Sequence, residues 1–187
     1  MTLVRYYAAQ TLDGYIAESD DSIGWLTGYE GSFEGADSDA GQAGYDEFYE
    51  EIGAMVMGST TYEWVLAHAG GWPYAGKPTW VLSSRTLALP EGEDVDVRIV
   101  GTEVPDLIDE MRDAAGERDI WIVGGGPVAS QFADRGLLDR VEVTVAPVVL
   151  AGGKRLFERR PPGGPMQLIS ARTFASGMVG LTYEIRR

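Results

Sequence analysis

Short apolar runs and segments of helical periodicity alternate along most of the chain. The apolar runs predict β-strands at residues 3–9, 54–57, 79–82, 95–100, 119–123 and 141–145. The segments between them predict helices at residues 45–52, 59–67, 105–115 and 128–134. In the first of these helices, Tyr45, Phe48, Tyr49 and Ile52 are spaced to share one face. This alternation is typical of an α/β domain.

The end of the chain departs from that alternation. Residues 166–174 and 179–185 predict two strands joined at Ser176 and Gly177, which together would form an antiparallel hairpin. Strand–helix alternation followed by a hairpin favours a mixed sheet. No linker-like segment divides the chain, so we expect a single domain over residues 1–187.

Residues 18–44 are rich in Gly, Ser and Asp and predict a long surface loop. Trp25, Tyr29 and Phe33 would anchor this loop to the body of the protein. Loops of this length in compact domains are usually functional or mobile. The segment is therefore a candidate for covering a binding site.

The composition narrows the classes of function. The 187 residues include no cysteine and one histidine, His68, so the usual zinc ligand sets cannot form and we expect no metal site. A formal net charge of −14 argues against nucleic-acid binding, which needs a basic surface. The chain shows no signal peptide and no apolar run as long as a membrane span. We therefore expect a cytoplasmic protein with no membrane partner.

Three consecutive glycines are the strongest local signal. Gly124, Gly125 and Gly126 end one predicted strand and precede a helix. Ligands of open α/β sheets bind at the carboxyl ends of strands, and a helix N-terminus offers unpaired N–H groups to anions. The triplet therefore predicts a phosphate cradle, and the alternative is a tight turn with no ligand. Ala129 stands where the dinucleotide-binding GxGxxG pattern needs its last glycine, so that pattern is absent.

Two further strand ends carry groups that suit phosphate. Gly58 is followed by Ser59, Thr60 and Thr61, whose hydroxyl and N–H groups could bind a second phosphate or could simply cap the helix. A third strand ends in two serines and an arginine, a set that suits a phosphomonoester but also occurs in polar surface loops. The residues of that end are Ser83, Ser84 and Arg85. One extended dinucleotide with several phosphates would explain all three ends, which favours a nicotinamide cofactor.

Two other side chains could carry chemistry. Asp46, near the start of the first helix, could be a buried site acid, although the solvated face of the helix is the simpler interpretation. His68 would be required by any serine–histidine hydrolase, but a histidine at the end of a helix also interacts favourably with the helix dipole.

Five stretches in order along the chain resemble the dihydrofolate reductase superfamily over nearly its whole length. They are AAQTLDGYIA, MGSTTYE, WVLSSR, IWIVGGGPVASQF and VEVTVAPVVLAGGKRLF. The GGGP and LAGGKRLF forms are closer to the C-terminal reductase domain of the bifunctional riboflavin-biosynthesis deaminase/reductase. The resemblance implies a three-layer α/β/α fold with a mixed sheet of about eight strands, NADPH as cofactor and a homodimer.

The resemblance also implies roles for particular residues. Backbone groups of Ala9 and Ile16 would border the nicotinamide, and residues 20–26 would form a flexible loop over the active site. Gly58 and Thr61, with Ser59 beside them, match residues at the cofactor pyrophosphate. The glycine triplet would border the pyrophosphate and nicotinamide, with a cis peptide between its first two members.

The remaining roles concern the adenine end of the cofactor and the substrate. Ser83, Ser84 and Arg85 match the adenine-ribose end, where Arg85 could select NADPH through its 2′-phosphate. Lys154 and Arg155 could hold a substrate phosphate or could be surface charges. Trp25, in the loop over the active site, is a further candidate substrate contact.

Two departures from the dihydrofolate reductase pattern favour the riboflavin branch. Ser59 stands where dihydrofolate reductases usually carry arginine, and no carboxylate fits the register of their buried acid, Asp46 being nearest. We therefore expect an NADPH-dependent reductase of a small heterocycle, acting as in the reduction of 5-amino-6-(5-phosphoribosylamino)uracil. Dihydrofolate reduction and a non-catalytic nucleotide-binding module are the alternatives. The deaminase half is not expected, because the chain has no zinc ligand set.

Overall fold

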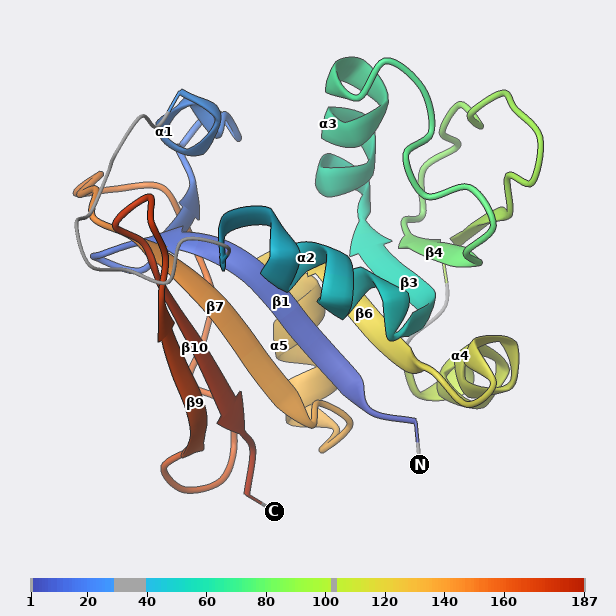
Figure 1. Ribbon diagram of the computed structural model, residues 1–187. Helices are drawn as coiled ribbons and strands as arrows, with labels where there is room; N and C mark the ends of the chain where they lie inside the picture. The colour runs from blue at the N-terminus through green and yellow to red at the C-terminus, as the bar shows by residue number, and fades with distance from the viewer. Residues whose placement is uncertain (1, 29–39, 102–103, 187) are drawn as a thin grey trace.

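The central feature of the protein is an eight-stranded mixed sheet (Figure 1). The computed structural model describes residues 2–28, 40–101 and 104–186, with residues 40–44 described as backbone only. The strand order is β5-β4-β3-β6-β1-β7-β10-β9. The strands are β1 Val4–Thr11, β3 Ile52–Gly58, β4 Thr79–Leu82, β5 Val97–Val100, β6 Asp119–Gly124, β7 Arg140–Ala146, β9 Gln167–Thr173 and β10 Val179–Glu184.

Most strands of the sheet share one direction, and the direction alternates only at the β7 side. The six strands from β5 to β7 are parallel, β10 runs antiparallel to β7, and β9 runs antiparallel to β10. The predicted mixed sheet and the terminal hairpin are thus confirmed. Because the six parallel strands share one direction, their carboxyl ends lie along the same edge of the sheet.

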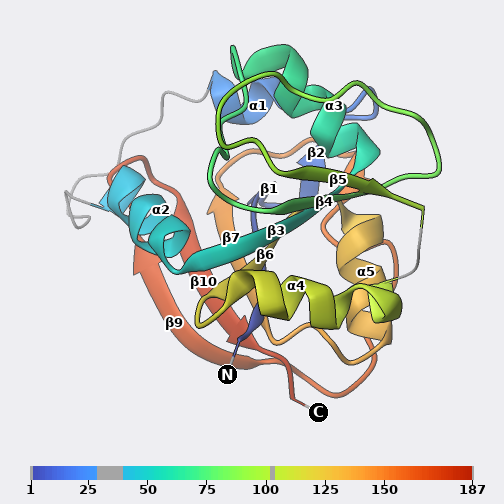
Figure 2. The ribbon, with the colours of Figure 1, turned by 90° about the vertical axis from the view of Figure 1, so that its right-hand side faces the viewer.

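Helices cover both faces of the sheet and make three layers (Figure 2). The alternation of side chains along β3 shows how: Ala54 and Val56 join the core beneath α4 and α5, whereas Met55 and Met57 face α2 and α3. The helices are α1 Gly24–Thr27, α2 Ala40–Glu50, α3 Ser59–His68, α4 Ile108–Ala115 and α5 Gly126–Asp134, with a 3₁₀ turn at Val104–Asp106. No helix within the described ranges is long and apolar enough to cross a membrane.

The segment predicted as a long loop contains structure at both of its ends. The short helix α1 lies inside it, and α2 begins at Ala40, before the first residue of the predicted helix. The apolar face that predicted this helix begins only at Tyr45, so the earlier turns carried no periodic signal. Tyr29 and Phe33 lie outside the described residues.

A second, two-stranded sheet was not predicted. It pairs β2 Tyr15–Ala17 antiparallel with β8 Lys154–Arg155. Strands of two or three residues are too short to show a period, and their pairing joins segments that are distant in the sequence. This small sheet lies beside the edge where the carboxyl ends of β1, β3 and β6 meet.

Candidate active site

A cavity of about 1140 Å³ opens at the carboxyl ends of β1, β3 and β6. This is the edge at which parallel sheets bind ligands. The first turns of α3 and α5, the small sheet and the β9–β10 turn complete its walls. Small-molecule pockets occupy about 300–1,000 Å³, so this cavity has room for an extended ligand or for two ligands side by side.

Two helix N-termini face one end of the cavity. The N-cap residues of α3 and α5 are Gly58 and Gly125, and neither helix has a side-chain cap. The prediction that a hydroxyl caps α3 is therefore wrong, because the cap position falls on Gly58 and places Ser59 inside the helix. Ser59, Thr60 and Thr61 line the cavity instead. First-turn N–H groups and the positive ends of two helix dipoles converge here, which suits an anion. We call this part of the cavity the anion end.

The three glycines of the triplet have different surroundings. The Gly124–Gly125 peptide is cis, as the resemblance implies. A Cβ on Gly124 would lie 3.1 Å from Thr61 Oγ1, and a Cβ on Gly126 would lie 2.5 Å from the carbonyl oxygen of Arg155. Protein atoms therefore leave no room for a side chain at Gly126. At Gly125 the nearest atom is Pro127 Cδ at 3.6 Å, an ordinary contact. The packing of the protein alone does not require glycine at Gly125.

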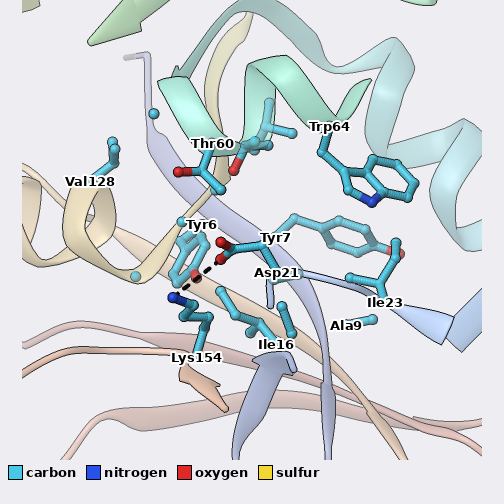
Figure 3. A pocket seen from close by; sticks show the side chains of 18 of the residues that line it. Tyr6, Tyr7, Ala9, Ile16, Asp21, Ile23, Thr60, Trp64, Val128 and Lys154 are labelled. Atoms are coloured by element: carbon cyan, nitrogen blue, oxygen red, sulfur yellow. Dashed lines mark ion pairs between the residues drawn. The ribbon is translucent and has the colours of Figure 1, made fainter. Parts of the chain in front are cut away.

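Two cations from β8 stand beside the anion end. Lys154 and Arg155 both line the cavity, and Gly126 places the α5 N-terminus against the backbone of Arg155. Lys154 Nζ lies 3.4 Å from Asp21 Oδ1, an ion pair that crosses the cavity (Figure 3). The Arg155 guanidinium lies 5.1 Å from the ring centroid of Tyr15 and donates a hydrogen bond to its hydroxyl.

The other end of the cavity is aromatic. Tyr7, Tyr45, Tyr74 and Trp121 line it and contact one another, with the Tyr45 and Tyr74 ring centroids 6.0 and 5.8 Å from that of Trp121. We call these four residues the aromatic compartment. Burial raises the pKa of Tyr45 to about 12 and also raises the pKa values of Tyr7 and Tyr74. Their phenol groups are therefore neutral at neutral pH and can donate hydrogen bonds.

Most residues predicted at the cofactor lie in this cavity. Its lining includes Ala9, Ile16, Gly58, Ser59, Thr61, Gly124, Gly125 and Gly126, together with both cations of β8. The structure therefore brings together the Asp-Gly segment, the strand end at Gly58 and the glycine triplet. These segments are far apart in sequence and meet because their strands are neighbours in the sheet.

The residues that follow β4 do not line the cavity. Arg85 is exposed and forms a bidentate pair with Glu63 of α3, with Nη2 2.7 Å from Oε2. Ser83 Oγ accepts a hydrogen bond from the Arg85 backbone N–H, and Ser84 is exposed. Leu82, one residue earlier, does line the cavity. The residues predicted to bind the adenine-ribose end of the cofactor thus lie next to the cavity. The guanidinium of Arg85 is already bound to the carboxylate of Glu63.

Three other candidates lie away from the cavity lining. Trp25 is buried in α1, and Asp46 is exposed on α2 beside Tyr45. The predictions for these two residues gain no support from their positions. His68 is exposed, stacks on Trp64 and approaches the Trp64 carbonyl oxygen at 2.8 Å with Nδ1. No group of metal-binding side chains occurs among the described residues.

Tyr7, Tyr74 and Trp121 were not predicted as site residues, and Asp21 was predicted only as part of the loop at residues 20–26. Tyr7 could have been found, because it is two residues before Ala9 in the same predicted strand and therefore shares its face. Trp121 lies in the apolar run IWIV, where an indole is indistinguishable from core. Asp21 and Tyr74 lie in irregular segments that gave no periodic signal.

Comparisons with known proteins agree with this architecture. The uncharacterized protein YwjB of Bacillus subtilis is 29% identical over 172 residues, covering 92% of each chain. A crystal structure from Shewanella sp. PV-4, whose name assigns that protein provisionally to riboflavin biosynthesis, superposes with a TM-score of 0.81. It is 27% identical and covers 100% of both chains.

The fold extends to a more distant group. A dihydrofolate reductase from Enterococcus faecalis matches with a TM-score of 0.64 at 15% identity, covering 99% of this chain and 97% of that one. The expected dihydrofolate reductase-like fold is thus confirmed. The model of the RibD C-terminal domain matches residues 2–180. From this match over nearly its whole length, the chain belongs to the RibD C-terminal domain family.

Proposed function

We propose that this protein is an NADPH-dependent reductase of a small heterocyclic substrate, with chemistry resembling the reductase step of riboflavin biosynthesis. Membership of the RibD C-terminal domain family supports a reductase. The shape of the cavity supports a dinucleotide, because an anion end and an aromatic compartment occur side by side in one space. The pyrophosphate would accept hydrogen bonds from the first turns of α3 and α5. The nicotinamide would lie near Ala9, Ile16 and the cis peptide.

The residues of the cavity would orient the two reactants. Bound NADPH would supply a hydride to an electrophilic carbon of the substrate, and a solvent proton would then neutralise the attached nitrogen or oxygen. The residues of the chain would bind and position the cofactor and the substrate. Lys154 and Arg155 would add positive charge beside the cofactor phosphates. Apolar residues such as Ile16 and Ile23 would limit the access of water to the reacting atoms.

Gly125 is the observation that carries the proposal. Its φ of −96° is open to any residue, and an added Cβ would meet only Pro127 Cδ at 3.6 Å. Neither this torsion nor contact with residues beyond its two chain neighbours requires glycine there, yet the position is the N-cap of a helix that lines the cavity. Close approach of a ligand to the backbone is a physical reason for omitting a side chain at such a position.

The test is a titration of NADPH against the Gly125→Ala variant, followed by protein fluorescence. We expect the variant to keep the unfolding temperature of the wild type and to lose affinity for NADPH about tenfold or more, which is about 1.4 kcal/mol. Gly152→Ala is the matched control, because its added methyl group meets nothing within 4 Å and Gly152 does not line this cavity. Wild-type affinity in Gly125→Ala, or no binding of NADPH to the wild type, would contradict the proposal.

A further inference from the structure

Positive charge is distributed very unevenly along the chain. Residues 6–76 contain no lysine or arginine, while carboxylates recur throughout this stretch. The stretch supplies most of β1 and all of β2, α1, α2, β3 and α3. It therefore provides Tyr7, Tyr45 and Tyr74 of the aromatic compartment.

The remaining lining residues near the aromatic compartment bring no cationic side chain either. Trp121 of β6 completes the compartment, and Thr144 of β7 forms a hydrogen bond with the Tyr7 hydroxyl. The β9–β10 turn contributes Phe174, Ser176 and Met178 to the cavity lining. The described residues that line this end of the cavity carry aromatic, aliphatic and hydroxyl groups but no cationic side chain. Lys77, whose Nζ lies 4.3 Å from the Tyr49 ring centroid behind the compartment, does not line the cavity.

The two cations that do line the cavity, Lys154 and Arg155, both come from β8. A Cβ on Gly126 would lie 2.5 Å from the carbonyl oxygen of Arg155, which fixes β8 against the N-terminus of α5. Figure 3 shows Lys154 on the side of Tyr6 and Val128, away from Trp64 and Ile23. Lys154 is also paired with Asp21. Because β8 lies against the N-terminus of α5, we expect these cations to serve the phosphates of the cofactor.

The aromatic compartment would bind a phosphorylated substrate weakly. Moving a phosphate out of water without a paired cation or several charge-assisted hydrogen bonds is unfavourable by several kcal/mol. The carboxylates of residues 6–76 add a repulsive field. An uncharged planar ring instead gains stacking against the aromatic side chains and hydrogen bonds from neutral phenols.

We propose that the substrate of this protein is an uncharged planar heterocycle that carries no phosphate. The proposal rests on the reductase function proposed above and narrows it. It separates this chain from an enzyme that acts on the phosphorylated compound 5-amino-6-(5-phosphoribosylamino)uracil. It also disfavours dihydrofolate, whose glutamate tail is anionic at neutral pH.

The test compares two probes that differ only in the phosphate: 5-amino-6-(5-phosphoribosylamino)uracil and its dephosphorylated ribosylamino counterpart. Each is titrated into the wild-type protein saturated with NADP⁺, and binding is followed calorimetrically. We expect the dephosphorylated probe to bind about tenfold or more tightly than the phosphorylated one. Equal or tighter binding of the phosphorylated probe would overturn the proposal. Failure of both probes to bind at millimolar concentration would also overturn it, because the compartment would then not accept a pyrimidine ring.

A pair of variants tests whether the missing cation causes this preference. Leu26 and Thr27 are adjacent in α1, but only Leu26 lines the cavity, while Thr27 is exposed. We expect Leu26→Arg to raise affinity for the phosphorylated probe and Thr27→Arg to leave it unchanged. An equal response of the two variants would contradict a local cause. Failure of the proposed function is recognised separately, as absence of nicotinamide nucleotide binding to the wild type.

Discussion

Arg85 shows how the function of one residue depends on a single partner. Its guanidinium is held by both carboxylate oxygens of Glu63, at 3.2 and 2.7 Å. In dinucleotide sites an arginine accommodates the 2′-phosphate of NADP, whereas a carboxylate binds the free 2′-hydroxyl of NAD. The ion pair places an arginine and a carboxylate together beside the cavity. The preference of Arg85 for NADPH and the preference of Glu63 for NADH would therefore oppose each other. We infer that Glu63 limits discrimination between NADPH and NADH.

Glu63→Gln should release Arg85 and raise the ratio of NADPH to NADH affinity by a few-fold. The size is modest because an exposed ion pair contributes about 0.2–1 kcal/mol. Titration of both nucleotides gives the ratio directly. Glu110→Gln is the control, since it removes one carboxylate partner of Arg98, which keeps its pair with Asp96, and neither Glu110 nor Arg98 lines the cavity. An unchanged ratio in Glu63→Gln would show that Arg85 has no part in cofactor choice.

The glycine triplet marks what a sequence can and cannot show about single residues. Its composition predicted a crowded turn at a strand end, and the turn is there. The identity of the crowding group was not predictable. At Gly126 it is the carbonyl of Arg155, and at Gly124 it is Thr61, contributed by segments distant in the sequence. The same limit applied to Arg85, whose partner Glu63 lies on a different element.

The helix α2 holds the aromatic compartment against the sheet. Phe48 stacks on Tyr7 with ring centroids 4.4 Å apart and meets Trp121 edge-on at 5.2 Å. Tyr45, one turn earlier on the same face, contacts Trp121 and lines the cavity. The face that fixes α2 to the core therefore also forms a wall of the site.

This packing predicts how stability depends on pH. Burial raises the pKa of Tyr45 to about 12, against about 10 for an unperturbed tyrosine. Above about pH 10 the unfolded chain releases this proton while the folded protein keeps it, so stability falls as pH rises between about 10 and 12. Denaturant unfolding as a function of pH should show that loss, with a shallower slope in Tyr45→Phe. If stability fell as steeply with pH in the variant as in the wild type, the assignment of this pH dependence to Tyr45 would be refuted.

Elements with a clear period were predictable from the sequence, and elements fixed by tertiary contacts were not. The strand at residues 79–82 was predicted with its observed ends, and the other main strands with ends shifted by a few residues. The small sheet of β2 and β8, the helix α1 and the early turns of α2 lacked any local period. Tyr74, which was missed as a site residue, lies in such a non-periodic segment.

The two edges of the parallel part of the sheet differ in their contacts: the edge at the amino ends of the strands is stabilised by ion pairs, and the edge at the carboxyl ends forms the cavity. At the amino end of the strands, Arg5 is buried and joins Glu142, Asp119 and Glu51, which connects β1 to its neighbours β7 and β6. At the carboxyl end there is no such network among the described residues, and the edge opens into the cavity. This division predicts that cofactor and substrate share the carboxyl edge and that the amino edge maintains the fold.

The measurement that tests this account most directly is a crystal structure of the protein with NADPH. We predict that the pyrophosphate lies within hydrogen-bond distance of first-turn N–H groups of both α3 and α5. The nicotinamide should lie between Ala9 and the Gly124–Gly125 peptide, facing the aromatic compartment. A nucleotide bound outside the cavity, or one with its nicotinamide beside Ser83 and Arg85, would contradict the account.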